Sequence, residues 1–442
     1  MTHETATPSP GADTRAKPGA QAVVDTLADR LRDPEAVVAA TTANGDLIDI
    51  ADIPCPPWDP STLSRGPGAL AILYSELGDR ETAHEYLLRT VAASGSSPVD
   101  GPFQGLGGLA TATRLAARDP DDYAGILGRL DDRMSEHARW LVRVHEATRQ
   151  GGVPTCAGVV DTISGLSGVG RYLLARGRFD VLREVLSCLA TLREPIVVDG
   201  VPVPGWWFDG TEKSLVGPEF EQGQVNFGLA HGIPGPLALL SLAWTAGVRV
   251  EGQAEAIECI ADWLLEWREK DAWGSYWTAY IPLPYYADRT AAEPPRPARA
   301  SWCYGAPAIA RTLEFAATAL DRPEWSEAGL EAFRSLLTRP RESWGITDDA
   351  LCHGWAGMLN LCTIFDRNHP DENFGAVADE IATGLAERFD PALPFGYRYH
   401  QPLAELSLDL PGLMEGAAGI ALALDGYVRA PRTGWDSALL LS

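Results

Sequence analysis

Cysteine and histidine side chains recur beside short glycine turns of this sequence. The turns read HG at 231–232, SWCYG at 301–305 and CHG at 352–354. Two cysteines and one histidine are the ligand set of a catalytic zinc site, in which three protein ligands leave one coordination position open. The alternative is that Cys303 and Cys352 are small buried residues, the usual fate of free cysteines. No CxxC or HExxH motif is present, so the zinc prediction depends on these turns lying together.

Other turns of the same kind carry further polar side chains. Asp161 precedes the turn at 165–168, Tyr304 follows Cys303, and Glu415 directly precedes Gly416. If all the turns share one rim, these side chains face one cavity at the positive ends of the helix dipoles. Each has a structural alternative, because Asp161, His231 and Glu415 could be ordinary helix caps and Tyr304 could be a packing residue.

The glycine turns form an internal repeat, which tells how these side chains are positioned. Gly-x-x-Gly, or a near form of it, precedes an apolar helical run seven times. The copy near Gly66 is contracted, and the copy at Gly305 has Ala308 in place of its second glycine. Glycine lets the chain turn sharply and lets backbones approach closely at the start of a buried helix. The first glycines of the copies are 66, 105, 165, 232, 305, 354 and 416.

Amphipathic stretches alternate with these apolar runs, and their apolar residues recur at spacings of three and four. The pattern predicts an all-α fold, a double ring of seven buried inner helices and seven polar-faced outer helices. The predicted outer helices are Gln21–Ala40, Glu81–Ala93, Tyr123–Thr148, Asp180–Leu192, Gln253–Glu269, Trp325–Leu337 and Ala376–Arg388.

Two insertions interrupt the helical pattern. The first, at about 195–223, contains two β-branched runs around Asp199-Gly200, which predicts a β-hairpin. Trp206 and Trp207 follow the hairpin and either line a peptide groove or pack in the core. The second insertion, Leu283–Ala300, is rich in Pro, Tyr and Arg.

Composition narrows the class of protein. The chain has 60 acidic and 36 basic residues, a formal charge of −24, which disfavours binding to nucleic acid and to anionic membranes. No apolar run is long enough for a transmembrane segment, and the N-terminus lacks a signal-peptide core. Seven scattered cysteines favour a reducing, cytoplasmic location. We predict a disordered tail over residues 1–19 and a single toroidal domain over 20–442.

The same residues identify a resemblance to the lanthionine synthetase C-like family. It rests on WCYG at 302–305, CHG at 352–354, HG at 231–232 and DxxxGLSG from Asp161, and the repeats extend it over about residues 60–430. The resemblance implies an α/α toroid around one zinc ion. It also implies roles for seven residues: Cys303, Cys352 and His353 as zinc ligands, His231 as acid and base, Asp161 as its orienting carboxylate, Arg299 as an active-site arginine, and Tyr304 beside the metal.

Proteins of this family close thioether rings, so the resemblance also implies an activity. A substrate cysteine thiolate would add to dehydroalanine or dehydrobutyrine in a dehydrated precursor peptide, composed of leader and core. The implied partners are a separate dehydratase and a transporter complex, because the repeats begin near residue 60 and leave no room for a fused dehydratase. Two alternatives stay open: addition of glutathione or another thiol to dehydrated residues, and a zinc-stabilised scaffold without catalysis. Arg299 could also be a solvated residue of its polar insertion.

Overall fold

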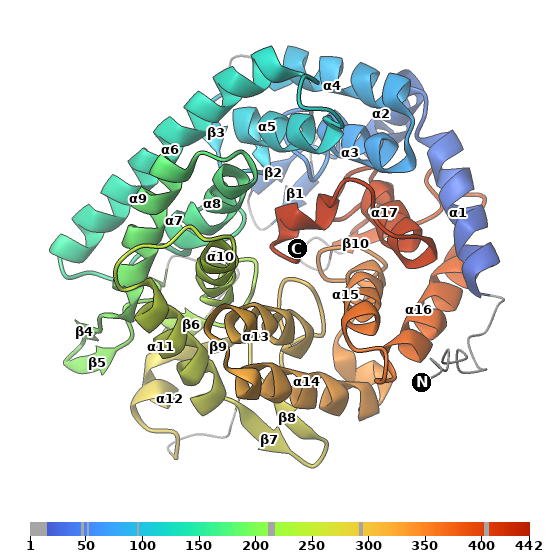
Figure 1. Ribbon diagram of the computed structural model, residues 1–442. Helices are drawn as coiled ribbons and strands as arrows, with labels where there is room; N and C mark the ends of the chain where they lie inside the picture. The colour runs from blue at the N-terminus through green and yellow to red at the C-terminus, as the bar shows by residue number, and fades with distance from the viewer. Residues whose placement is uncertain are drawn as a thin grey trace, which may run out of the picture.

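The computed structural model describes residues 16–45, 48–50, 53–94, 97–210, 217–290, 295–401 and 406–442. Within them, fourteen helices form two concentric rings (Figure 1). The inner helices are α3 (Pro67–Leu77), α5 (Gly105–Ala116), α8 (Leu166–Ala175), α10 (Pro234–Thr245), α13 (Ala306–Leu320), α15 (Trp355–Asn368) and α17 (Ala417–Val428). The outer helices are α1 (Ala16–Arg30), α4 (Arg80–Ser94), α6 (Ala124–Gln150), α9 (Phe179–Ala190), α11 (Gln253–Glu266), α14 (Pro323–Thr338) and α16 (Phe374–Arg388). The predicted double ring is confirmed.

The inner helices are buried on nearly all sides, which explains their uniformly apolar sequences. The second glycine of the repeat, present in every copy except the one at Gly305, lets the inner helix start against the preceding turn. A Cβ atom on Gly168 would lie 2.0 Å from the carbonyl oxygen of Thr162, and one on Gly419 would lie 1.9 Å from that of Leu413. No side chain fits at these distances, so the repeated glycines are required by close packing at the rim.

The first outer segment differs from its prediction in two ways. It is broken into α1 and α2 (Pro34–Thr42), because the Asp33 side chain caps α2 by accepting from the backbone N–H of Glu35 and proline follows at the first helical position. Helix α1 also begins at Ala16, so residues 16–19 belong to it and the predicted tail is too long. This helix forms because it packs against α16 and α17 and closes the ring (Figure 1). The rest of the predicted tail lies outside the described residues.

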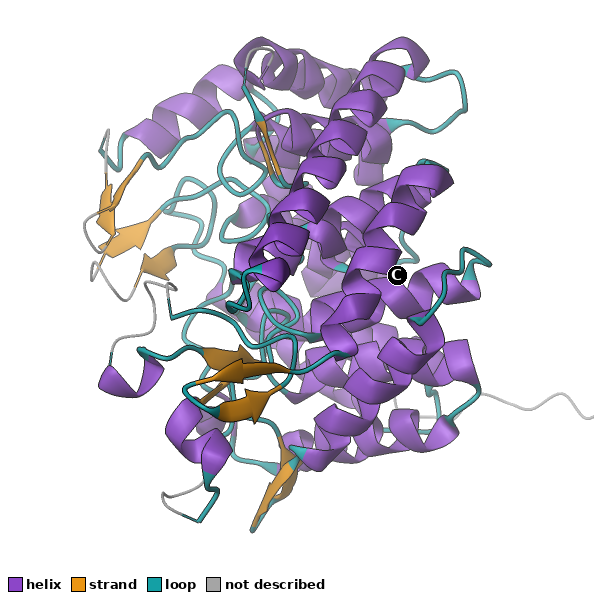
Figure 2. Cartoon of the chain, turned by 90° about the vertical axis from the view of Figure 1, so that its left-hand side faces the viewer, coloured by secondary structure: helices purple, strands orange, loops and turns teal. Residues whose placement is uncertain are grey.

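Strands and the loops between them gather on one side of the helical ring (Figure 2). The predicted hairpin is confirmed: β4 (Ile196–Val198) pairs with β5 (Val201–Val203), and Asp199 and Gly200 have the positive φ angles of 49° and 80° that a tight turn of this kind needs. An additional pair forms between β6 (Gln224–Asn226), directly after the first insertion, and β9 (Tyr280–Pro282), directly before the second.

The other strands and short helices complete this side of the molecule. Trp206 and Trp207 are buried there, and the indole N–H of Trp207 donates to the carbonyl of Gln222, so both pack in the core and the groove hypothesis for them is wrong. The remaining elements are β1 (Ile48–Ile50), β2 (Ile53–Cys55), β3 (Val99–Asp100), β7 (Glu269–Asp271), β8 (Gly274–Tyr276), β10 (Tyr399–Gln401), β11 (Leu406–Leu408), α7 (Ala157–Val160) and α12 (Leu283–Ala287).

The C-terminal segment fills the middle of the ring (Figure 1). Its 3-10 helix η4 (Trp435–Leu439) and the two leucines after it are almost fully buried. Inner-ring side chains bind it: Arg114 donates to Ser437 Oγ (2.8 Å), Arg311 to the carbonyl of Leu441 (2.9 Å) and the Trp302 indole to that of Leu439 (2.9 Å). Among the described helices, none has an apolar stretch that could cross a bilayer.

Acidification is expected to destabilise the ring through His145, a buried residue of α6. Burial lowers the pKa of His145 from 6.5 to about 4, so the folded protein binds this proton less readily than the unfolded chain. Its contribution is complete above pH 6.5 and is lost as the pH falls towards 4, by about 2–3 kcal/mol. Denaturant unfolding at about pH 7 and about pH 4.5 should show a smaller loss for His145→Gln than for the parent. An equal loss in both proteins would contradict this assignment.

Candidate metal centre and active site

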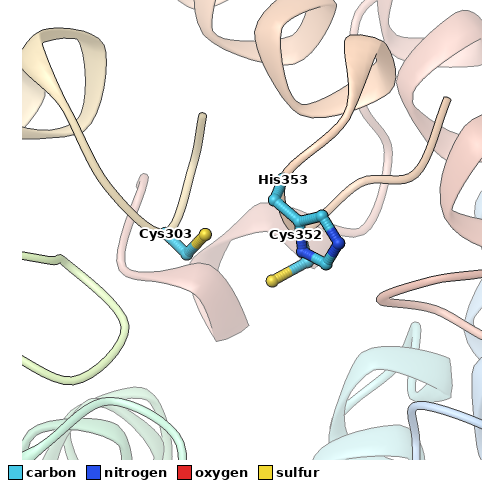
Figure 3. A group of neighbouring side chains, drawn as sticks. All are labelled: Cys303, Cys352 and His353. Carbon is cyan, nitrogen blue, oxygen red and sulfur yellow. The ribbon is translucent and has the colours of Figure 1, made fainter. Parts of the chain in front are cut away.

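The structure brings Cys303, Cys352 and His353 together at one rim of the ring. Their ligand atoms all lie within 4.8 Å of one another, and Figure 3 shows both sulfurs and one ring nitrogen of His353 facing a common point. Cys303 comes from the turn before α13, and the other two come from the turn before α15. Neighbouring copies of the repeat therefore supply a cluster that no local motif contains.

Backbone hydrogen bonds join successive rim turns and fix their relative positions. In each bond, an N–H of one turn donates to a carbonyl of another turn of the repeat. The two cysteines lie at such a junction, so their spacing depends on the rim and not only on their side chains. The bonds are Leu63 to Phe103 (2.8 Å), Thr162 to Ala230 (3.0 Å), Ala230 to Cys303 (3.5 Å), Cys303 to Cys352 (3.2 Å), Cys352 to Met414 (2.9 Å) and Leu413 to Leu63 (3.1 Å).

The surroundings of His353 fit a metal ligand. Its Nε2 atom lies 3.4 Å from Asp348 Oδ2 and 3.2 Å from the hydroxyl of Tyr399, so Nδ1 is the nitrogen on the side of the sulfurs. Metal-binding histidines usually donate their second N–H to a carboxylate or a similar group, which orients the ring. Asp348 Oδ2 is buried and has no hydrogen-bond partner among the described residues. A donor N–H on Nε2 of His353 would satisfy this oxygen. Two sulfurs and one imidazole nitrogen in this arrangement fit zinc.

Electrostatics also prepare the cluster for a cation. The Cys352 thiol donates a hydrogen bond towards Cys303, and with His353 beside it this holds the pKa of Cys303 well below its usual value. The neighbouring Cys303 thiolate, together with burial, raises the pKa of Cys352. Ser301 Oγ lies 3.3 Å from Cys303 Sγ. The two directions together favour a shared proton between the two sulfurs, and a bound cation would favour the thiolate form of both cysteines.

His231 and Asp161 form a second pair of candidate functional residues on the same rim. His231 Nδ1 lies 2.6 Å from Asp161 Oδ2, while Oδ1 of the same carboxylate accepts from the backbone N–H groups of Ser164 and Gly165, both at 2.8 Å. Asp161 is therefore a turn-capping residue and the partner of the histidine at once. The Asp161 side chain is 1% exposed and that of His231 is 41% exposed, so the carboxylate is fixed and the imidazole is accessible to a substrate.

Tyr304 connects the His231 turn to the metal cluster. Its hydroxyl lies 2.5 Å from that of Tyr280 and accepts from Asn226 Nδ2 at 3.2 Å. Its ring also lies against the backbone at Gly228, where a Cβ atom would come within 2.6 Å of it. Because Tyr304 directly follows Cys303 and touches the loop that leads to His231, the two parts of the site lie side by side.

Arg299 lies at the edge of this site. It is half-buried, has no ion pair or hydrogen bond with any described residue, and is close enough to Cys352 and His353 for electrostatic contact. Its partial exposure is compatible both with a place in the active site and with solvation of its guanidinium. Its charge is available to an anionic group of a substrate.

Sequence analysis missed three residues of the site. Asp348 lies six residues before Gly354, the first glycine of its copy, whereas Asp161 lies four before Gly165, so the repeat spacing did not indicate it. Tyr399 comes from β10, outside the repeat, and Tyr280 comes from β9, directly before the second insertion. Neither carries a local signal.

The double ring with a Cys₂His cluster on its rim places the chain among the α/α-toroid enzymes. The family model for lanthionine synthetase C-like proteins matches residues 57–440. Nisin biosynthesis protein NisC of Lactococcus lactis subsp. lactis is 23% identical over 407 residues, which cover 86% of this chain and 88% of that protein. The solved structure of nisin cyclase has a TM-score of 0.70 and 20% identity, covering 96% of this chain and 97% of that chain.

The chain belongs to the lanthionine synthetase C-like family, because the family model covers most of its length. The resemblance predicted from the rim motifs is thereby confirmed, and with it the predicted fold and the enzyme class, a lanthionine synthetase C-type cyclase.

Proposed function

We propose that this protein is a zinc-dependent lanthipeptide cyclase, which joins cysteine thiols to dehydroalanine or dehydrobutyrine residues of a dehydrated precursor peptide. The observation that carries the proposal is the convergence of Cys303, Cys352 and His353 beside the His231 turn. The similarity in sequence to NisC and in structure to nisin cyclase supports the substrate class. A separate dehydratase as partner, a transporter complex and a cytoplasmic location belong to the same proposal, since the peptide must be dehydrated before rings can close.

Cys303, Cys352 and Nδ1 of His353 would hold the zinc ion. A zinc ion in such a site lowers the pKa of a thiol that enters the open coordination position. Asp161 accepts a hydrogen bond from the Nδ1–H group of His231, which places the lone pair of the neutral ring on Nε2. His231 can therefore take the proton of the entering thiol, and the nearby carboxylate stabilises the imidazolium that results.

Carbon–sulfur bond formation at Cβ of the dehydrated residue leaves an enolate. The enolate oxygen gains negative charge, which the guanidinium of Arg299 can stabilise because no carboxylate among the described residues neutralises it. Protonated His231 then returns its proton to Cα, so the thiol proton is conserved and the ring closes by addition alone. Tyr304 keeps the His231 loop against the Cys303 turn.

A thiol-alkylation assay tests the proposed function. The protein is incubated with zinc and a dehydrated precursor peptide, and residual thiols are then alkylated. The masses of the products are measured by mass spectrometry. Ring closure leaves the peptide mass unchanged and removes one alkylatable thiol per ring. Mass increments of added glutathione would favour intermolecular thiol addition instead, and an unchanged thiol count in the presence of bound zinc would favour the scaffold.

Asp161→Asn is expected to slow the reaction by about tenfold to a hundredfold while the protein stays folded and metal-loaded. The asparagine oxygen can still accept from Ser164 and Gly165, so stability should change by less than about 1 kcal/mol. Its amide cannot balance a protonated His231, so the pH optimum should move. Parent-like rates over about pH 6 to 8 would show that the carboxylate only caps its turn.

A further inference from the structure

A groove of about 630 Å³ opens beside the active site, between β9 and the segment 295–299. Arg299 and Tyr304 line it, so it is continuous with the site described above. Most of its other walls are proline and aromatic side chains: Phe220, Tyr280, Pro282, Tyr285, Pro295 and Pro297. We call it the proline groove.

The walls of the proline groove are held in place without a ligand. The rings of Phe220 and Tyr280 pack edge to face, with centroids 6.4 Å apart, and Tyr280 packs in turn on Tyr304. The Tyr276 hydroxyl donates to the carbonyl of Pro295 (3.2 Å). The backbone N–H of Ala298 donates to the carbonyl of Trp277 (2.9 Å). A preformed groove needs little ordering when a ligand enters, which favours binding.

The chemistry of the walls selects the kind of ligand. Prolines have no backbone N–H, so this lining offers few donors to pair with an extended peptide as an added strand. Its surface is mainly apolar. The charges of Glu219 and Arg296 at its exposed edge have opposite signs, and Arg299 adds one positive charge where the groove meets the active site. The groove therefore suits bulky apolar side chains and does not favour a strongly charged ligand.

We propose that the proline groove is a specificity site, which binds a large apolar side chain next to the dehydrated residue of the substrate. The proposal rests on the proposed cyclase function. Arg299 and Tyr304 belong to both the groove and the active site. A substrate residue directly next to the dehydrated residue can therefore place its side chain in the groove. The volume falls within the range of about 300–1,000 Å³ that small-ligand sites have, which leaves room for a leucine or phenylalanine side chain.

The test uses two synthetic peptides, each with one cysteine and one dehydroalanine, that differ only in leucine or glycine beside the dehydroalanine. We expect the parent protein to prefer the leucine peptide in kcat/KM by about tenfold or more, as burial of one large apolar side chain predicts. Ala298→Trp, which places an indole in the groove, should reduce this ratio to about one. Ala287→Trp is the matched control, because Ala287 is exposed in the same insertion and does not line the groove. It should keep the preference.

A binding measurement separates this proposal from the proposed function. Fluorescent versions of both peptides, with serine in place of dehydroalanine, cannot react, and their affinities follow from anisotropy. If the parent protein binds the leucine peptide more tightly than the glycine peptide and Ala298→Trp removes this difference, the specificity-site proposal is supported even if no ring forms. Equal affinities and equal kcat/KM values in the parent would overturn the groove, even if cyclisation is efficient. If Ala298→Trp does not fold, Phe220→Ala, which removes one wall, is expected to abolish the preference in its place.

Discussion

Cys303→Ala is expected to lose the zinc ion and the cyclase activity together. Two protein ligands, Cys352 and His353, would remain, and they hold zinc far more weakly than three. The lost side chain is also the one that is most ready to bind, since its pKa lies well below the usual value for a thiol. Activity should fall by about a thousandfold or more, and metal analysis after dialysis should find less than about a tenth of the parent's zinc.

The control for this variant is Cys362→Ala, which removes a buried thiol from inner helix α15 outside the cluster. It should keep full zinc occupancy, although it leaves a small cavity in the core. Circular dichroism of both variants checks that the ring has formed. Full zinc occupancy in Cys303→Ala would remove Cys303 from the ligand set.

His231→Ala should also lose activity but should keep its zinc ion, giving a metal-loaded protein that closes rings very slowly. His231 lies on an accessible rim turn and bonds to Asp161, and it is not among the three side chains that converge on the metal position. Loss of a positioned acid and base slows a reaction by about a hundredfold to ten-thousandfold. Single-turnover alkylation assays with excess enzyme measure this directly, because they do not depend on product release.

An exposed histidine provides the comparison. His84→Ala, on outer helix α4, should match the parent in both rate and zinc content. Loss of zinc from His231→Ala would show instead that His231 is a ligand or supports one. The acid and base role would then have to pass to another residue.

The ring and the metal cluster could be predicted from the sequence because both repeat a local signal. Each turn of the Gly-x-x-Gly kind precedes a buried helix, and the cysteines and histidines stand in register with those turns. Knowing the register was enough to expect Cys303 and Cys352 to lie together, although 48 residues separate them.

Other parts of the site depend on contacts between segments that share no pattern. The pairing of β6 with β9 brings Asn226 opposite Tyr280, and nothing in either short strand specifies this partner. Tyr399 reaches His353 from β10, which lies in a connection outside the repeat. Helix α1 extends back to Ala16 only because α16 and α17 offer it a surface. Such contacts depend on the assembled fold, so the local sequence does not indicate them.

The central position of residues 435–441 has a consequence for the synthesis of the protein. Arg114, Trp302 and Arg311 bond to residues that the ribosome adds about 130 to 320 positions later. Inner helices made early therefore cannot complete their packing until residues 435–441 have been added, and α1 must wait for α16 and α17 as well. Until then, apolar helix faces stay exposed on the nascent chain, where they are available to chaperones or to aggregation. The Trp302 indole, next to Cys303, gains its partner Leu439 only after 137 further positions of the chain have been added, so the turn that carries Cys303 matures late.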